Sequence, residues 1–199
     1  MPSSASLLAF LAMIDNVLER LTTLFTEGGA HFRVIHHPSA GQSSQSVAEI
    51  RGTELGQGAK ALCCTVKGNG VKKHVLGVLP ADMQADLSKL AAAVGGRRAS
   101  LASPDEVMDL TGCIFGAVPP VSFHPDLELI CDPTLFTRYS ELAFNAGSRD
   151  VSIIISTDDF KRIVAPKVAA FLRDAASAPL KNKTNKQVVN CLNLRPKVS

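Results

Sequence analysis

Three glycine-containing segments carry the polar residues of this chain that could do chemistry. The first runs from Gly52 to Lys60 and brings a lysine to the start of an apolar, β-rich stretch. It departs from both common phosphate-binding patterns, because a P-loop places its lysine directly after the last glycine and a dinucleotide fingerprint lies between a strand and a helix. Two interpretations stay open: a lysine that contacts an anionic substrate, and a solvated lysine at a strand start.

The second segment, Gly112 to Pro120, combines two glycines with a double proline. Glycine lets backbone amides approach a ligand closely, and proline fixes the backbone that follows. Such a loop could hold preorganised donors for the oxyanion of an ester under attack, or it could be a rigid turn. In the third segment, 143–148, Asn145 could orient a substrate, although asparagines in turns often bond their own backbone.

The five cysteines, at positions 63, 64, 113, 131 and 191, form an odd set with no CxxC pair. This pattern favours a reducing, cytoplasmic location over a secreted disulfide framework. Cys63 and Cys64 lie in an apolar run, where a cysteine is typically a packing residue, so a cysteine nucleophile is the weaker hypothesis. The five histidines lack paired metal-ligand spacing, and we expect no metal and no cofactor.

Composition and charge favour a soluble globular protein. The apolar fraction is 46% and the charged fraction 20%, and no apolar run reaches the roughly 18 residues of a membrane span. The net charge of +3 is uneven, because residues 180–199 hold five basic and no acidic side chains. The rest of the chain has a net charge of −2, so we expect nucleic-acid affinity in the tail rather than in the body.

Periodicity predicts an α+β (mixed α/β) domain. Asn69-Gly70 between two apolar runs, 59–66 and 71–79, predicts a β-hairpin, and hairpins mixed with helical crossovers exclude a doubly wound sheet. An amphipathic helix is predicted over 6–27. Further strands are predicted at 31–36, 98–102, 127–131 and 151–156, and further helices at the Ser46–Glu49 capping box, over 82–94, after Ser103, after Asp132 and from Thr157 onward.

In order and spacing, these segments resemble the YbaK/prolyl-tRNA-synthetase-associated aminoacyl-tRNA editing domain family. The matching stretches are Arg51–Thr53 through Lys60–Leu62, Ser100–Val107, Gly112–Pro120 and Phe144–Gly147. The chain is most similar in appearance to free-standing members of the YeaK type. The resemblance implies a mixed, barrel-like β-sheet surrounded by helices. It also divides the chain into an N-terminal helix packed on the domain (1–26), the editing domain (27–166), and the end of the last helix with a basic flexible tail (167–199).

The resemblance further implies hydrolysis of the ester that joins a wrong amino acid to tRNA. Lys60 and Gly116 would be catalytic, and the expected substrate-binding residues are Ser46, Ala117, Val118, Pro119, Pro120, Asn145 and Gly147. Val121 stands where the family usually has an aromatic residue, which we interpret as a wider pocket. Resemblance to the free-standing members, together with the small residues Gly116, Ala117 and Val118 in the loop, implies serine or threonine as the amino acid, with alanine second. Such a second hydrolytic site serves where a synthetase cannot reject a near-isosteric amino acid.

Two other functions remain open from the sequence: a non-catalytic adaptor that binds tRNA or a synthetase, and a small-nucleotide-binding protein. The expected partners of the enzyme are mischarged tRNA and an aminoacyl-tRNA synthetase or elongation factor. No membrane association is expected, and the protein is predicted to be a monomer.

Overall fold

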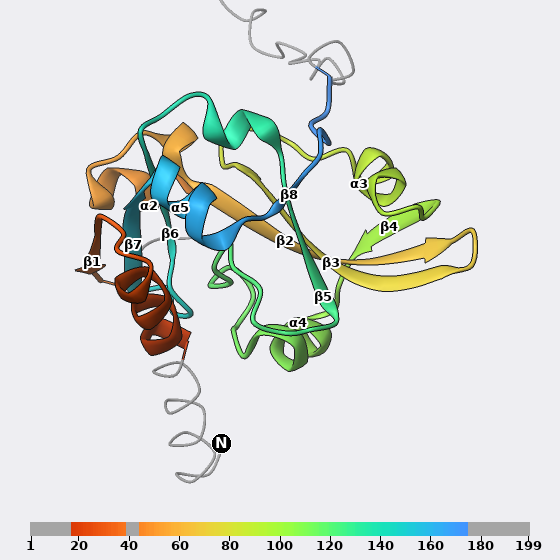
Figure 1. Ribbon diagram of the computed structural model, residues 1–199, viewed down its shortest axis with the longest axis horizontal. Coiled ribbons are helices and arrows are strands. Elements are labelled where there is room, and N and C mark those ends of the chain that lie inside the picture. The colour runs from red at the N-terminus through yellow and green to blue at the C-terminus, as the bar shows by residue number, and fades with distance from the viewer. Residues whose placement is uncertain (1–16, 39–43, 175–199) are drawn as a thin grey trace, which may run out of the picture.

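The chain folds into two β-sheets that share an apolar core and are surrounded by helices (Figure 1). The computed structural model describes residues 17–38 and 44–174. One sheet has three antiparallel strands in the order β1 (Phe32–His36), β7 (Val151–Ser156), β6 (Glu141–Asn145). The other has five in the order β4 (Arg98–Leu101), β2 (Ala59–Gly68), β3 (Val71–Pro80), β5 (Leu127–Cys131), β8 (Lys167–Val168).

The predicted mixed α+β class is confirmed, but the predicted barrel-like closure is wrong. The strands form two separate hydrogen-bonded ladders. An isolated parallel bridge between Gly58 and Ala143 is where the backbones of the two sheets meet. We call the line along which the sheets meet at this bridge the junction.

The β2–β3 hairpin is the longest feature of the five-stranded sheet and projects from the body of the molecule (Figure 1). Its two-residue turn has positive φ at both positions, 55° at Asn69 and 75° at Gly70. This is the turn that the Asn-Gly dipeptide predicts, because its twist matches that of the flanking strands. The remaining pairs are antiparallel for β4 on β2 and parallel for β5 on β3 and for β8 on β5.

The described helices comprise residues 17–27 at the N-terminal side and a set of short elements between strands. These are α2 (Ser44–Arg51), η1 (Leu55–Gln57), α3 (Leu87–Ala93), α4 (Pro104–Thr111), η2 (Pro133–Phe136) and α5 (Thr157–Val164). The segment 17–27 buries Val17, Leu21 and Phe25 at helical spacing against both sheets, as its apolar stripe predicts. The remainder of the helix predicted over 6–27 lies outside the described residues. The model contains, in its described part, no helix that is long and apolar enough to cross a membrane.

Several predicted boundaries are wrong for local reasons. Asp86 accepts hydrogen bonds from the amides of Ser88 and Lys89, so α3 begins at Leu87 rather than at 82. Helix α2 begins at Ser44, which places Ser46 inside the helix instead of at its cap. Helix α5 ends at Val164, where Ala165 is left-handed, so no helix continues past 166. By contrast, Ser103 and Glu106 form the predicted capping box of α4.

After α5 the chain returns to the fold. The side chain of Phe171 is fully buried, and its backbone amide donates to Oδ2 of Asp132 at 2.9 Å. Residues 167–173 are therefore part of the packed structure, whereas the basic segment 180–199 lies outside the described residues.

Candidate active site

A cavity of about 570 Å³ lies at the junction of the two sheets. Strand β2 forms one wall, strand β6 the opposite wall, and helix α2 and the loop after α4 complete it. The lining residues are Ser44, Val47, Ala48, Arg51, Thr53, Leu55, Gly58, Ala59, Lys60, Ala61, Leu62, Cys63, Ala81, Leu101, Val107, Phe115, Gly116, Val118, Ala143, Phe144, Asn145 and Arg149. Most of the wall is apolar, and a few polar groups converge on it, which is the usual composition of a small-ligand site.

Lys60 is the second residue of β2 and is half-buried rather than solvated. Its Nζ donates to the backbone oxygen of Met83 at 2.6 Å. Burial lowers the pKa of Lys60, and the nearby Asp82 carboxylate opposes part of that shift. Arg138 binds Asp82 through two hydrogen bonds, of 2.8 and 2.7 Å, and lowers the pKa of that carboxyl. Asp82 is thus paired with Arg138, and the lysine ammonium makes one hydrogen bond to the described residues, the one to Met83.

Arg51, at the end of α2, is the centre of a set of hydrogen bonds between side chains of distant segments. Its Nη2 donates to Oδ1 of Asn145 at 2.5 Å, and its Nε donates to the hydroxyl of Ser152 at 2.8 Å. That hydroxyl also lies 2.7 Å from Nε2 of His37. Asn145 in turn donates through Nδ2 to the carbonyl of Gly116 at 2.8 Å. We call His37, Ser152, Arg51 and Asn145 the polar network.

The polar network has a consistent set of donors and acceptors. The Ser152 hydroxyl accepts from Arg51, so its proton is available to Nε2 of His37. Nδ1 of His37 lies 3.1 Å from the carbonyl oxygen of Pro38, which can only accept, so Nδ1 is the donor of that bond. Burial lowers the pKa of Arg51 to about 10, and the guanidinium is charged at neutral pH.

The loop after α4 is held from both sides. Gly116 has a φ of 84°, a left-handed conformation that strains any residue with a side chain. The polar network fixes the Gly116 carbonyl, and Nη2 of Arg149 donates to the carbonyl of Phe115 at 2.7 Å. With both carbonyls bonded to side chains, the loop presents a fixed backbone at the edge of the cavity.

A family model described as the aminoacyl-tRNA editing domain matches residues 37–163, which include the entire wall of this cavity. The chain belongs to this family. A curated relative from Escherichia coli (strain K12), the multifunctional Ser/Thr-tRNA deacylase ProXp-y, is 59% identical over 157 residues, covering 79% of this chain and 93% of the relative. The uncharacterized protein YwhH of Bacillus subtilis is 27% identical over 151 residues, covering 76% and 93%.

A solved structure supports the same family. The crystal structure of a candidate trans-editing enzyme for prolyl tRNA synthetase superposes with a TM-score of 0.67 at 25% identity. The match covers 79% of this chain and 98% of the other. The family predicted from the sequence motifs is therefore confirmed.

The editing domain brings four of the predicted site residues to the cavity wall: Lys60, Gly116, Val118 and Asn145. The others do not line it. Ala117, Pro119, Pro120 and Gly147 are buried, and the carbonyl of Ala117 accepts from the amide of Gly147 at 3.1 Å. These four residues are packed in the protein interior and do not contact the cavity.

Ser46 is also absent from the cavity wall, and the neighbouring Ser44 and Val47 line it instead. The residues of α2 that line the cavity, Ser44, Val47, Ala48 and Arg51, recur at helical spacing on one face, and Ser46 does not lie on that face. The interpretation of Val121 was wrong too. Its side chain is buried in the core with Leu127 and Leu135, so it does not set the width of the cavity.

Most residues of the cavity wall were not predicted as site residues, and among these Arg51, Phe115 and Arg149 take part in the hydrogen bonds that hold the loop and the polar network. Arg51 was part of a matching stretch, and its place before Gly52-Thr53 was the signal available. Its partners Asn145 and Ser152 lie 94 and 101 residues away in sequence, so nothing local indicates the contact.

Cys63 lines the cavity, but its thiol is unsuited to nucleophilic attack. Burial raises the pKa of Cys63 to about 11 and those of Cys64 and Cys131 to about 12. Burial also raises the pKa of Cys113. A thiol needs its thiolate form to react, and these environments disfavour that form at neutral pH. Within 17–38 and 44–174, no group of three or more His, Cys, Asp or Glu side chains is placed to hold a metal ion.

Proposed function

We propose that this protein hydrolyses the ester bond between tRNA and a wrongly attached small amino acid, acting in trans as a free-standing deacylase. Membership of the aminoacyl-tRNA editing family and 59% identity to a Ser/Thr-tRNA deacylase support this function. The structural observation that carries it is the meeting of Lys60, Gly116 and Asn145 at one cavity, although they come from three distant segments.

Lys60 is proposed to bind a phosphate of the terminal nucleotide. Among the described residues its ammonium has one hydrogen-bond partner, the carbonyl of Met83, and it lies at the edge of an apolar cavity. A phosphate oxygen offers a charge-assisted bond in place of a neutral one, and such bonds are roughly twice as strong. The exchange would place the ester deeper in the cavity, beside the loop.

The loop around Gly116 is proposed to stabilise the oxyanion that forms when water attacks the ester. An aminoacyl ester is already activated, so backbone donors and a positioned water suffice without a covalent intermediate. Donors that are fixed before the reaction stabilise charge at no reorganisation cost. The polar network supplies this rigidity by holding the Gly116 carbonyl through Asn145.

The cavity is suited to an adenosine end that carries a small side chain. Its volume of about 570 Å³ falls in the range of sites that enclose one small ligand. The wall from β2 presents the small side chains of Ala59, Ala61 and Cys63. We expect serine and threonine esters to be the best substrates and alanine esters the next.

The test compares deacylation of seryl-, threonyl-, alanyl- and prolyl-tRNA under one condition. The expected order is serine and threonine first, alanine second and proline last. A preference for the prolyl ester, or equal rates for all four, would contradict the substrate assignment. Tight tRNA binding without hydrolysis of any ester would instead favour the adaptor function.

Partners beyond tRNA are a further part of this proposal. Contact with an aminoacyl-tRNA synthetase or elongation factor, a monomeric state and a cytoplasmic location all remain predictions from the sequence. Light scattering behind size exclusion tests the monomer, and co-elution with purified synthetases tests the contact.

A further inference from the structure

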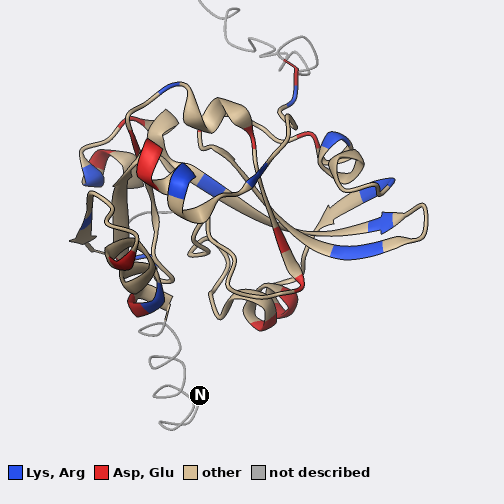
Figure 2. Ribbon diagram, viewed as in Figure 1, with Lys and Arg blue, Asp and Glu red and all other residues tan. Residues whose placement is uncertain are grey.

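Three cations stand in one line across the five-stranded sheet, away from the cavity. Lys67 of β2 pairs in register with Lys72 of β3 on one side and with Arg98 of β4 on the other. Residues directly opposite each other on neighbouring strands present their side chains on the same face. We call Lys72, Lys67 and Arg98 the basic row. Figure 2 shows basic residues gathered on the hairpin and on β4.

Folding alone does not explain the basic row. Like charges directly opposite each other destabilise a sheet. All three side chains are exposed, and none forms an ion pair with another described residue. The adjacent Lys73 differs, because it is bound to Glu128 at 2.9 Å. Strands β2 and β3 contain no acidic residue that could offset the charge.

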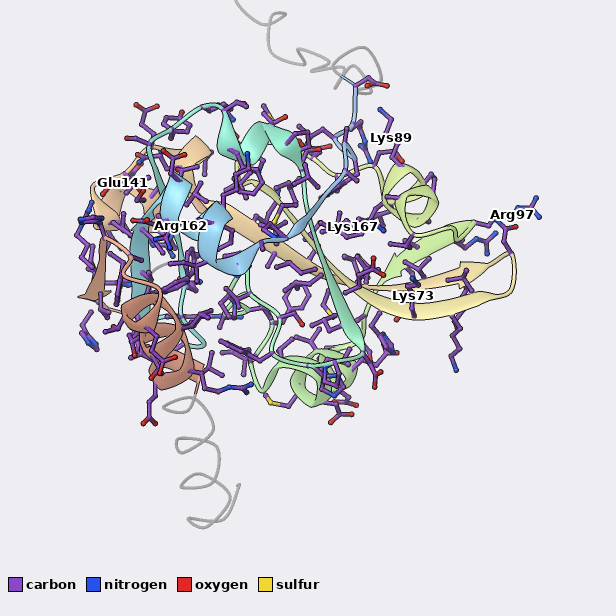
Figure 3. All side chains as sticks on the ribbon, in the orientation of Figure 1. Lys73, Lys89, Arg97, Glu141, Arg162 and Lys167 are labelled. Atoms are coloured by element: carbon purple, nitrogen blue, oxygen red, sulfur yellow. The ribbon has the colours of Figure 1, made fainter. Side chains whose placement is uncertain are left out.

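The surroundings of the basic row add to its positive charge. Arg97, the residue before β4, is exposed and extends outward at the same end of the molecule (Figure 3). The chain outside residues 180–199 has a net charge of −2, yet its basic residues are concentrated at this end of the five-stranded sheet. A row of unpaired cations at fixed spacing is suited to a polyanion, whose phosphates relieve the repulsion between them.

The basic row lies on the face of β2 that carries Cys63 of the cavity wall. Alternate residues of a strand share a face, so Lys67 and Thr65 follow Cys63, which lines the cavity. Four residues of strand separate Cys63 from Lys67, a distance of roughly 13 Å. Between them Thr65 bonds His74 at 3.4 Å, and the neighbouring carboxylate of Glu106 is engaged by Ser103. At the roughly 3.4 Å rise of stacked nucleotides, this distance corresponds to about four steps.

We propose that the basic row binds backbone phosphates of the tRNA acceptor end, a few nucleotides from the ester held in the cavity. The inference rests on the proposed function, because it takes the substrate to be tRNA. A substrate that binds the cavity and the basic row at the same time must have its ester and its acceptor-stem phosphates at the distance that separates these two sites. The contacts go to phosphates, so they add affinity without reading the base sequence.

The experiment compares the full-length protein with the double variant Lys67→Gln/Lys72→Gln. The matched control, Arg20→Gln/Lys161→Gln, removes the same charge from the N-terminal helix and from α5, which lie at the other side of the molecule (Figure 1). The kinetic parameters for seryl-tRNA and the affinity for uncharged tRNA are measured over a range of salt concentrations. A minihelix that contains only the acceptor stem and its 3′ end is measured in parallel.

We expect the double variant to raise KM and weaken tRNA binding roughly tenfold at low salt, with kcat unchanged. The slope of log affinity against log salt should become shallower by about one to two, since each lost phosphate contact removes about 0.7–0.9. The minihelix should show the same loss, and the control variant should behave like the wild type. The melting temperature of the double variant should equal or exceed that of the wild type, because repulsion is relieved.

An unchanged salt slope, an equal loss in the control, or a loss with tRNA but not with the minihelix would overturn the proposal. So would a fall in kcat at constant KM, which would indicate a structural effect on the cavity. The binding arm uses uncharged tRNA and needs no hydrolysis. A wild type that hydrolyses none of the esters would therefore refute the proposed function while still testing the basic row.

Discussion

Lys60 and Arg51 are two cations that line the same cavity, and they differ in the hydrogen bonds that their side chains make. Arg51 is bonded to two side chains, Asn145 and Ser152, and through them to the loop and to β7. The Lys60 ammonium makes one hydrogen bond within the described part of the chain, to a backbone carbonyl, and Lys60 is only half-buried. A group that must exchange its partner for a substrate phosphate needs few bonds, whereas a group that fixes geometry needs several. We therefore assign Lys60 to binding and Arg51 to positioning.

The largest effect is expected for Lys60→Ala. Removing the ammonium should lower kcat/KM roughly 100-fold or more, the usual loss when one charged donor is removed from an active site. The free energy of unfolding should change by only about 1 kcal/mol, because one hydrogen bond is lost. Deacylation assays and thermal melting measure the two quantities. Near-normal hydrolysis by a folded variant would break the assignment of Lys60.

A smaller loss of activity with a larger loss of stability is expected for Arg51→Lys. An ammonium cannot reproduce the forked geometry that reaches both Asn145 and Ser152, so one of them is left without its donor. We expect kcat to fall about tenfold and stability to fall by about 1–3 kcal/mol.

Arg149→Lys is the matched control for Arg51→Lys. Arg149 makes one hydrogen bond, to the carbonyl of Phe115, which a lysine can also make. Its kcat and melting temperature should stay close to those of the wild type. Equal effects of the two substitutions would show that Arg51 has no special positioning role.

The pH dependence of hydrolysis should follow the lowered pKa of Lys60. Burial favours the neutral amine, so Lys60 loses its proton at a lower pH than an exposed lysine. After the spontaneous hydrolysis is subtracted, kcat/KM should be constant near neutral pH and decline as the pH rises through this lowered pKa. Lys60→Arg should move the decline to higher pH, because a guanidinium stays charged. An identical decline in both proteins would assign it to another group.

The smallest effect on activity is expected for Cys63→Ser. The Cys63 thiol is neutral below a pKa of about 11, so it contributes to the wall and not to the chemistry. We expect kcat/KM within about threefold of the wild type and a destabilisation of about 1 kcal/mol from burying a hydroxyl. Mass spectrometry after rapid quenching provides a second test. An acyl group trapped on Cys63 would overturn the water mechanism and the comparison between the two cations.

Sequence patterns predicted those parts of the fold and site whose causes are local. The Asn69-Gly70 turn and the Ser103–Glu106 cap are set by neighbouring residues, and both form as expected. Strand β6 was missed because its end, Phe144-Asn145, runs into the small residues Ala146-Gly147, which indicate a turn. Asn145 was accordingly placed in a turn, although it ends a strand.

Contacts between distant segments could not be predicted. The loop motif pointed to Gly116 and Asn145 but not to the bond between them, which joins residues 29 positions apart. The basic row could not be predicted from net charge either, because the chain outside residues 180–199 has a net charge of −2. Strand register alone brings Lys67, Lys72 and Arg98 into line.

The bridge between Gly58 and Ala143 has a mechanical consequence for the cavity. Within the described residues, the strand backbones of the two sheets pair at this bridge alone, and the sheets share one apolar core. Apolar packing is not directional, so a small rocking of one sheet against the other breaks no ladder of hydrogen bonds. Lys60 belongs to one sheet and Asn145 to the other, so a substrate that contacts both residues would link the two sheets. Substrate binding should therefore reduce the motion of one sheet against the other, because the cavity lies between them.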